Sequence, residues 1–299
     1  MRSAASAREL VGTHGPRDPA MSHMMYQPGP PLDGLVDFFW TAECYVASTP
    51  RERILPSGTV SLVIHLEPRP VRIYSGSGAD DLESINTSGL ALCGARTTPM
   101  VIGAESLGAT IGIHFKPGGN GPFFDVPAEE FAEQVVPLEA LWGATATRLR
   151  ERLMEATSSL ARVRLMQEAL LQRARRPFAQ PAALRESLHA FEQSELESVA
   201  EVNRRTGLSP KRLLALYRDQ VGLSPKAFWR VRRFRAALGD LENGTDRGAS
   251  LAARHGYFDQ AHFLREFRAF AGSNPREYLA ARIVGTDHVA VYGKKDPSP

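Results

Sequence analysis

The sequence predicts a multidomain α+β protein with a β-rich barrel or sandwich first, a helical connector next, and an all-α domain after that. Three observations predict this order. Short apolar runs separated by turn residues fill residues 24–136, apolar residues recur at helical spacing over residues 137–176, and short helices joined by glycine turns fill residues 182–283. A chain of 299 residues is long enough for about two hydrophobic cores.

Five runs in the N-terminal region are typical of strands, because they are rich in Val, Ile, Phe, Tyr and Thr and end at turns that contain Pro or Gly. They cover residues 36–46, 51–55, 59–66, 71–74 and 109–115. Short strands at this spacing favour an antiparallel barrel or sandwich.

Two of these strands contain a histidine, His65 and His114. No His-x-His pair or other metal-ligand spacing surrounds either of them, so we predict no metal and no cofactor, and we interpret both as structural. The Lys-Pro-Gly-Gly sequence at residues 116–119 resembles an anion-binding turn only weakly, and a plain tight turn is the favoured interpretation.

The connector is expected to contain two amphipathic helices, at about 144–156 and 159–175. Their apolar stripe motivates the hypothesis that they hold two copies of the chain together as a homodimer. Two prolines within residues 173–181 deny helix and mark the boundary to the C-terminal domain.

The two ends of the chain and its composition give the remaining predictions about domain limits and localisation. Residues 1–23 are small, polar and broken by Gly and Pro, so we expect a disordered leader, and we expect residues 284–299 to be a flexible tail. No apolar run is long enough to span a membrane. Cys44 and Cys93 alone provide no disulfide framework, which indicates a cytoplasmic protein.

Charge is distributed unevenly along the chain. The formal net charge is +3, but residues 182–283 contain 17 Lys and Arg against 12 Asp and Glu, a net charge of +5. A basic half beside a slightly acidic one is the asymmetry expected of a module that binds a polyanion. Charge alone does not identify such a module, because many surface domains are equally basic.

Two segments of the C-terminal domain share one pattern, a short helix, a glycine turn and a second helix. They are residues 199–217, with Gly207 at the turn, and residues 250–267, with Gly256 at the turn. Glycine permits the left-handed turn, and apolar residues pin the second helix to the first. The opposite face of the second helix is then free to enter a DNA major groove. Two such units indicate a double helix-turn-helix domain.

A longer helix, residues 225–241, is expected between the two units. Its apolar positions form one stripe, made of Phe228, Val231, Phe234, Leu238 and Leu241. We expect further aromatic residues to belong to the core because they recur at helical spacing: Trp229, Phe263, Phe267 and Phe270. Tyr257 and Phe258 are expected to pack the second turn.

The C-terminal domain resembles the AraC/XylS family of bacterial transcription regulators over the whole of residues 182–283. GLSPKAFWRVRRFRAAL, residues 222–238, is similar to the linker-helix signature of that family, and GYFDQAHFLREFRAFAGSNPREY, residues 256–278, is similar to its terminal signature. The resemblance implies a transcription regulator, which we expect to be an activator and not an enzyme. It also implies double-stranded DNA as the partner, with the two recognition helices in successive major grooves.

The resemblance implies base-reading roles for two residues of the second unit. Gln260 and Arg265 match the base-reading positions of the family. Glutamine pairs with adenine and arginine with guanine, and each such pair contributes roughly 1–3 kcal/mol of discrimination.

The first unit departs from the family pattern. Lys211 and Arg212 stand at the exposed start of its recognition helix, where they can reach a guanine or a phosphate. Leu214 and Ala215 occupy positions that often carry polar base-reading residues in the family. Asn203 stands where a small alanine is usual. We therefore expect the second unit to carry more of the sequence specificity.

Six residues near the recognition helices are candidates for contacts with the DNA backbone, with a solvated arginine or, for the histidine, a packing role as the competing interpretation. They are Arg204, Arg205, Arg230, Arg232, Arg235 and His262.

The resemblance leaves the signal open. The N-terminal barrel of related regulators is often cupin-like, and it senses a signal or mediates dimerisation. A small-molecule effector, RNA polymerase and a second copy of the chain are therefore candidate partners. One rival interpretation is a cupin-type metalloenzyme or an alkylation-repair protein that carries a DNA-binding domain, which the missing metal-ligand cluster opposes. Another is a scaffold that reuses the helical fold without binding DNA.

Overall fold

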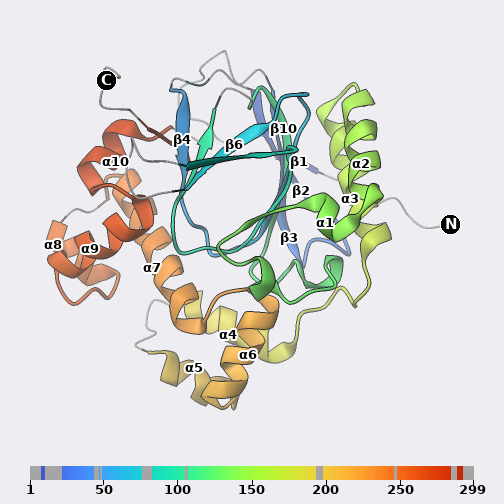
Figure 1. Cartoon of the computed structure of the whole chain (residues 1–299). Helices are drawn as coiled ribbons and strands as arrows, with labels where there is room; N and C mark the ends of the chain where they lie inside the picture. The colour runs from blue at the N-terminus through green and yellow to red at the C-terminus, as the bar shows by residue number, and fades with distance from the viewer. Residues whose placement is uncertain are drawn as a thin grey trace.

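In a computed structural model of the chain, the N-terminal half is a β-sandwich of two antiparallel sheets and the C-terminal half is helical (Figure 1). The structure describes residues 8–10, 22–43, 47, 49–75, 83–104, 107–192, 198–245, 248–283 and 288–291. The predicted order, a β-rich sandwich followed by helices, is confirmed.

The larger sheet has seven strands in the order β1-β2-β3-β10-β5-β8-β11. Its strands are β1 (Arg8–Leu10), β2 (Ser22–Gln27), β3 (Val36–Glu43), β5 (Ser61–His65), β8 (Leu90–Cys93), β10 (Ala109–Phe115) and β11 (Val135–Pro137). The second sheet has five strands in the order β12-β4-β9-β6-β7. These are β4 (Arg51–Ile54), β6 (Val71–Ser75), β7 (Glu83–Thr87), β9 (Met100–Gly103) and β12 (His288–Ala290).

All five strands expected from the sequence are present, as β3, β4, β5, β6 and β10. The expectations for the two ends were wrong in part. Residues 8–10 of the expected disordered leader form β1, which pairs with β2, and residues 288–290 of the expected flexible tail form β12, which pairs with β4. A three-residue strand is too short to show an alternating pattern. Ser22 and His23 of the expected leader begin β2, and Val291 of the expected tail is buried. The remaining residues of both ends lie outside the described residues, as do residues 44–46 of the first expected strand, which include Cys44.

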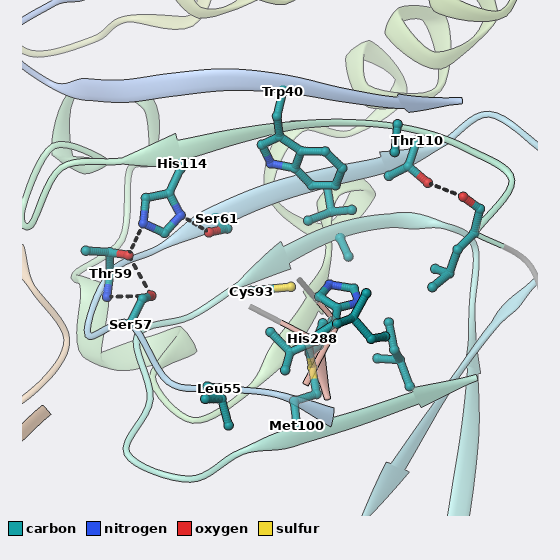
Figure 2. A pocket seen from close by; sticks show the side chains of 18 of the residues that line it. Trp40, Leu55, Ser57, Thr59, Ser61, Cys93, Met100, Thr110, His114 and His288 are labelled. Atoms are coloured by element: carbon teal, nitrogen blue, oxygen red, sulfur yellow. Dashed lines mark hydrogen bonds between the residues drawn. The ribbon is translucent and has the colours of Figure 1, made fainter. Parts of the chain in front are cut away.

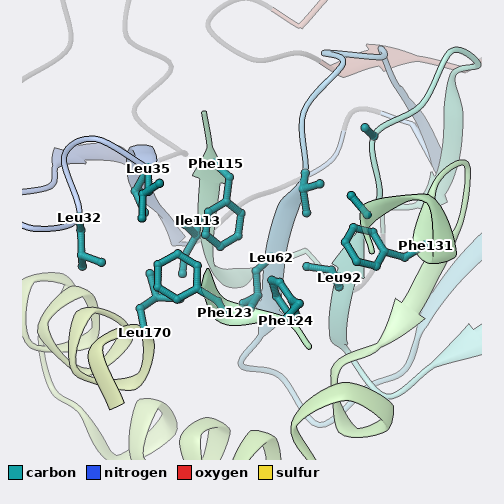
Figure 3. Close-up of a cluster of buried hydrophobic side chains, with 14 of the residues drawn as sticks. Leu32, Leu35, Leu62, Leu92, Ile113, Phe115, Phe123, Phe124, Phe131 and Leu170 are labelled. Carbon is teal, nitrogen blue, oxygen red and sulfur yellow. The ribbon is translucent and has the colours of Figure 1, made fainter. Parts of the chain in front are cut away.

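The connector forms three helices, α1 (Leu138–Trp142), α2 (Ala144–Glu155) and α3 (Ser159–Arg173), which lie against the outer face of the seven-stranded sheet (Figure 1). Figure 3 shows the resulting core, in which Leu170 of α3 lies beside Phe115, Phe123 and Ile113. The apolar stripe that motivated a homodimer is buried inside the chain in this core: Leu149, Leu153, Val163, Met166 and Leu170. The stripe is therefore no argument for dimerisation.

The described residues of the C-terminal half form seven helices. They are α4 (Ala182–Glu192), α5 (Val199–Thr206), α6 (Pro210–Gln220), α7 (Pro225–Glu242), α8 (Gly248–Arg254), α9 (Gln260–Ala271) and α10 (Pro275–Ala281). None of the helices in the described ranges is long and apolar enough to cross a membrane.

The turn at residues 116–119 joins the two halves through contacts with other parts of the chain. Lys116 donates to the Asp33 carbonyl at 2.8 Å, and Gln180 donates to the Pro117 carbonyl at 2.7 Å. A Cβ at Gly118 would lie 2.7 Å from the side chain of Leu184 on α4. The tight-turn interpretation is therefore the correct one, and the turn receives α4.

Candidate nucleic-acid interface

The first helix-turn-helix unit is formed by α5 and α6. Gly207 ends α5 with φ 67° and ψ 7°, the left-handed conformation that glycine adopts at no steric cost. The Ser209 hydroxyl then caps α6 by accepting from the Arg212 N–H at 3.4 Å, and Pro210 takes the first helical position. Leu213 faces inward and is buried. The turn chemistry expected from the sequence is confirmed.

The second unit is formed by α8 and α9 and repeats this geometry. Gly256 has φ 67° at the turn, and the Asp259 carboxylate caps α9 by accepting from the His262 N–H at 2.6 Å. Ala252 on α8 and Phe263 on α9 are both buried where the two helices meet. A larger residue than alanine at that crossing would push the helices apart.

The helix between the units, α7, buries the whole stripe expected of it, together with Ala237. Trp229 is half-buried at the edge of the core. The Ser224 hydroxyl caps the start of α7 by accepting from the Ala227 N–H at 3.2 Å. The helix thus forms one wall of both units.

A buried ion-pair cluster ties α7 to the second unit. Arg233 on α7 pairs with Glu266 on α9, with Nη2 2.9 Å from Oε2. Its Nη1 donates to the Gly256 carbonyl at 3.2 Å, and its guanidinium lies 4.2 Å from the centre of the Tyr257 ring. Arg230 donates its Nε–H to the other Glu266 oxygen at 2.5 Å. The Glu266 side chain, only 7% exposed, is therefore paired on both oxygens.

This cluster fixes the charge on Glu266. Burial alone would raise the pKa of this carboxyl, but hydrogen bonds and charge from Arg233 and Arg230 outweigh it and hold the pKa below its ordinary value. Arg233 lies within the linker-helix signature, residues 222–238, and had no predicted role, whereas Arg230 was a candidate for a contact with the DNA backbone. Arg230 and Arg233 are three residues apart and therefore share one face of the helix. This spacing was the available sequence signal that both could contact the same partner.

The exposed face of α9 carries the two predicted base-reading residues. Gln260 and Arg265 are both exposed, as is Arg268, which sequence analysis missed although it follows Arg265 by one helical turn. Leu264 on the same face is 39% exposed. The structure thus brings two polar groups, a further arginine and an apolar side chain together on one solvent-facing surface.

The exposed face of α6 has a different composition. Lys211 and Arg212 are exposed at its start, Ala215 is exposed one turn further on, and Leu214 is half-buried. At the other end of α6, Arg218 Nε lies 3.7 Å from Glu129 of the N-terminal half. Only the first turn of this helix offers basic groups to a partner.

Comparison with protein families identifies both halves of the chain. Residues 202–281 match a family described as a helix-turn-helix domain, and residues 24–137 match a family described as a domain of unknown function, DUF6597. The C-terminal domain is of the AraC type. The chain accordingly combines a helix-turn-helix domain with an N-terminal domain of unknown function.

Similarities to whole proteins are distant. No curated protein matches the chain. Among solved structures, the C-terminal domain of AraT, a response regulator from Geobacillus stearothermophilus, is 23% identical, with a TM-score of 0.32 over 36% of this chain and 89% of that one. ToxT from Vibrio cholerae is 12% identical, with a TM-score of 0.45 over 81% of this chain and 97% of that one. ToxT bound to an unsaturated fatty acid is 9% identical, with a TM-score of 0.45 over 81% and 93%.

In this domain the six candidates for DNA-backbone contacts differ in the exposure of their side chains and in their ion pairs. Arg204 is exposed, Arg232 and Arg235 are half-buried, and Arg205 is exposed but paired with Glu201 one turn away. Arg230 is occupied by Glu266. The structure therefore leaves Arg204 with the most open side chain of the set.

His262, the sixth candidate, makes its contacts inside the protein. Its Nδ1 accepts from the Phe258 N–H at 3.4 Å, its ring meets the Tyr257 ring edge-on at 5.4 Å, and its Nε2 lies 3.8 Å from Glu266. These contacts favour the packing role that sequence analysis kept open beside a DNA contact.

Phe258 corrects one expectation about the AraC-type turn. Tyr257 packs the turn as expected and is 5% exposed, but Phe258 is 91% exposed. It lies directly before the cap residue Asp259, so its side chain leaves the turn on the outside, beside Gln260. Such a large apolar group in solvent, next to a recognition helix, is a candidate contact with a partner.

Proposed function

We propose that the protein binds an operator with both recognition helices in successive major grooves, and that the second unit reads the bases. The observation that carries this proposal is the exposed face of α9, where Gln260 and Arg265 are free of ion pairs among the described residues and project from a helix capped by Asp259. Arginine and glutamine are the side chains that pair bidentately with guanine and adenine in the major groove.

The first unit acts in this proposal as an anchor. Lys211, Arg212 and Arg204 neutralise phosphates, while the apolar turn at Leu214 and Ala215 contributes little base discrimination. Phosphate contacts position a protein on DNA without selecting a sequence. The DNA-binding domain then spans residues 182–283.

The N-terminal domain, residues 24–136, senses a small-molecule signal, and the helices of the connector transmit its state. In this role the protein is a regulator that contacts RNA polymerase at the promoter, and it is not an enzyme. The operator sequence would indicate the oligomeric state of the bound protein, since a dimer requires two half-sites.

The test begins with selection of bound sequences from random duplex DNA, followed by affinity measurements on the selected operator. We expect Arg265→Ala to weaken operator binding by about 1–3 kcal/mol and to relax the preference at one base pair, while binding to random DNA is unchanged. Lys211→Ala should weaken binding to both DNAs equally and reduce the salt dependence by about one charge.

Arg148→Ala is the matched control, because Arg148 is an exposed arginine on α2, remote from the helix-turn-helix units, that contacts only Thr145. It should leave both affinities unchanged. Equal weakening of operator and random DNA by Arg265→Ala would remove the base-reading role, and salt-insensitive binding would remove the DNA-binding proposal altogether.

A further inference from the structure

We propose that the cavity between the two sheets of the sandwich binds a small aromatic carboxylic acid, and that the bound acid touches residues of the DNA-binding half directly. This inference rests on the proposed sensing function and gives it a site and a ligand chemistry. The cavity has a volume of about 610 Å³. Small-molecule sites in proteins occupy roughly 300–1,000 Å³.

The large apolar side chains of the seven-stranded sheet lie on its outer face, whereas in an ordinary sandwich such side chains lie between the two sheets. Its outer face carries Phe39, Leu62, Leu92, Ile113 and Phe115, which pack against the helices. Its inner face, which in a sandwich normally supplies the core, carries small or polar side chains around a few aromatic ones. The space between the sheets therefore remains open.

Strand register arranges this inner face in rows across four strands. The middle row runs Trp40, Gly112, Val63, Ala91. A Cβ at Gly112 would lie 2.3 Å from Cε2 of Trp40, so the indole lies flat on the glycine and only a glycine permits this. Beyond the indole, two small side chains leave a trough. A flat apolar ring fits this trough beside the indole, whose ring is stacked with that of His23 at 5.9 Å between ring centres.

Polar rows lie on both sides of the trough. On one side His114 is held by Thr59, whose Oγ1 is 2.9 Å from Nε2, and by Ser61, whose Oγ is 3.0 Å from Nδ1 (Figure 2). On the other side the Thr110 hydroxyl lies 3.0 Å from His65 Nδ1. No three His, Cys, Asp or Glu side chains of the described ranges lie close enough to hold a metal ion. The side chains of both rows can form hydrogen bonds with a bound molecule.

The electrostatics of the lining favour an anion. Burial, and then the charges of Arg150 and His288, lower the pKa of His65 to about 4, so this ring is neutral near pH 7. Burial raises the pKa of Cys93 to about 11, so its thiol is neutral as well. Three further lining residues carry charge, namely Arg96, Arg282 and Glu242. Arg282 Nη1 lies 4.0 Å from Glu242 Oε1, whereas the Nε and Nη1 of Arg96 are buried without a hydrogen-bond partner.

An unsatisfied buried guanidinium is costly, and a carboxylate is the group that satisfies it bidentately. Arg96 donates only its Nη2, to the Glu133 carbonyl at 2.9 Å. It lies three residues after the end of β8, on the side of Cys93. A ligand with a ring on Trp40 and an acid group toward Arg96 uses both features of the cavity.

The DNA-binding half completes the opposite wall. Figure 2 shows His288 and Met100 across the cavity from Trp40. Glu242 and Asn243 from the end of α7 also line the cavity, as do Arg282 and Ile283 after α10. His288 is held in place by the fully buried Glu52, with Nδ1 2.6 Å from Oε2. A molecule that fills the cavity therefore contacts the residues that flank the second helix-turn-helix unit.

The test uses benzoate and biphenyl-4-carboxylate, with the matched amides and with decanoate, and measures dissociation constants by titration calorimetry on the full chain. We expect an aromatic acid to bind about tenfold or more tightly than its amide, the size of one charge-assisted hydrogen bond. Arg96→Gln should abolish that preference and Arg96→Lys should retain part of it. Trp40→Leu should weaken the aromatic acids more than decanoate.

The control variant is Arg148→Gln, which should change nothing. Equal affinity for acid and amide, unchanged preference in Arg96→Gln, or no binding by either aromatic acid would overturn the inference. DNA affinity of the same preparations, measured with and without biphenyl-4-carboxylate, separates the two proposals. Ligand-free binding to the selected operator tests the DNA-binding function alone, and a shift in that affinity in the wild type but not in Arg96→Gln supports the ligand site.

Discussion

The two helix-turn-helix units have nearly the same local geometry but different cores. Leu213 and Tyr217 of the first unit belong to the same hydrophobic cluster as the large sheet and the connector helices. The second unit has a cluster of its own, built around Phe263 and Phe267. One unit is continuous with the sandwich, and the other is nearly self-contained.

The second unit contacts the sandwich through the five-stranded sheet and the residue after β4. Leu55, which follows β4, and Val289 of β12 enter its core, and Arg53 Nη1 donates to the Ala271 carbonyl at 3.2 Å. The comparison teaches that one unit of the domain shares the main core of the sandwich, while the other has a core of its own that borders it. It agrees with the proposed division into an anchoring first unit and a base-reading second unit.

The largest expected effect separates the two cores. Tyr217→Ala and Phe267→Ala each remove a fully buried aromatic ring, which costs about 3–5 kcal/mol. We expect Tyr217→Ala to raise amide hydrogen exchange in the large sheet as well as in α4–α6, because all share one core. Phe267→Ala should raise exchange within residues 225–283 only. Equal spread of exchange in both variants would refute the distinction between the cores.

The ion-pair cluster is the next way to isolate the second unit. Glu266→Ala leaves Arg233 buried without its carboxylate, which costs about 3–5 kcal/mol. Thermal unfolding followed by hydrogen exchange should show loss of α8 and α9 before the sandwich. Arg268→Ala, an exposed arginine one turn from Arg265, is the matched control and should change stability by less than about 0.5 kcal/mol.

Acid should destabilise the two cores in different pH windows. His65 has a folded pKa of about 4 against an ordinary value of 6.5, so the unfolded state binds its proton first and the sandwich loses stability as the pH falls from 6.5 to 4. The loss is about 2 kcal/mol at pH 5. The pKa of Glu266 is lowered in the folded protein, so its contribution to stability is fully present above the ordinary pKa of a carboxyl group. That contribution is lost as the pH falls through this range towards the lowered pKa.

Site-resolved exchange at pH 7 and pH 5 measures this difference. His65→Gln should remove the pH dependence of the sandwich between these values and leave the second unit unaffected. If the second unit instead loses stability at pH 5 as much as the sandwich does, the assignment of these windows is wrong.

The smallest expected effect concerns Phe258. Because its side chain is 91% exposed, Phe258→Ala should change stability by less than about 0.5 kcal/mol. On the selected operator we expect a loss of about 1 kcal/mol through an apolar contact with a thymine methyl group. Replacing each thymine in turn by uracil should reproduce that loss at one position in the wild type and have no effect there in Phe258→Ala. A loss at no position would exclude the methyl contact.

The parts of the structure that follow local rules were predictable from the sequence. Gly207, Gly256, Ser209 and Asp259 set turns and caps through their own backbone and side-chain chemistry, so both units were located correctly. The base-reading and backbone roles of the exposed residues stay predictions, because nothing in the folded chain tests a contact with DNA.

Other features depend on distant parts of the chain and left no local signal. The outward position of Phe258, the pairing of Arg230 with Glu266 and the burial of the connector stripe are set by packing between elements far apart in the sequence. The cavity follows from strand register, which places Trp40 over Gly112 from residues 72 positions apart. No periodicity within one strand reveals such a neighbour.

Strand β12 has a consequence for how the molecule is made. The edge of β4 stays unpaired until residues 288–290 have left the ribosome, so the sandwich is finished only after the helix-turn-helix units have been synthesised. An N-terminal half expressed by itself would expose that edge and Leu55, and unpaired edges recruit other chains. The N-terminal half and the helical half are therefore a single unit of biogenesis, and attempts to produce the first alone should begin by supplying a substitute for the missing strand.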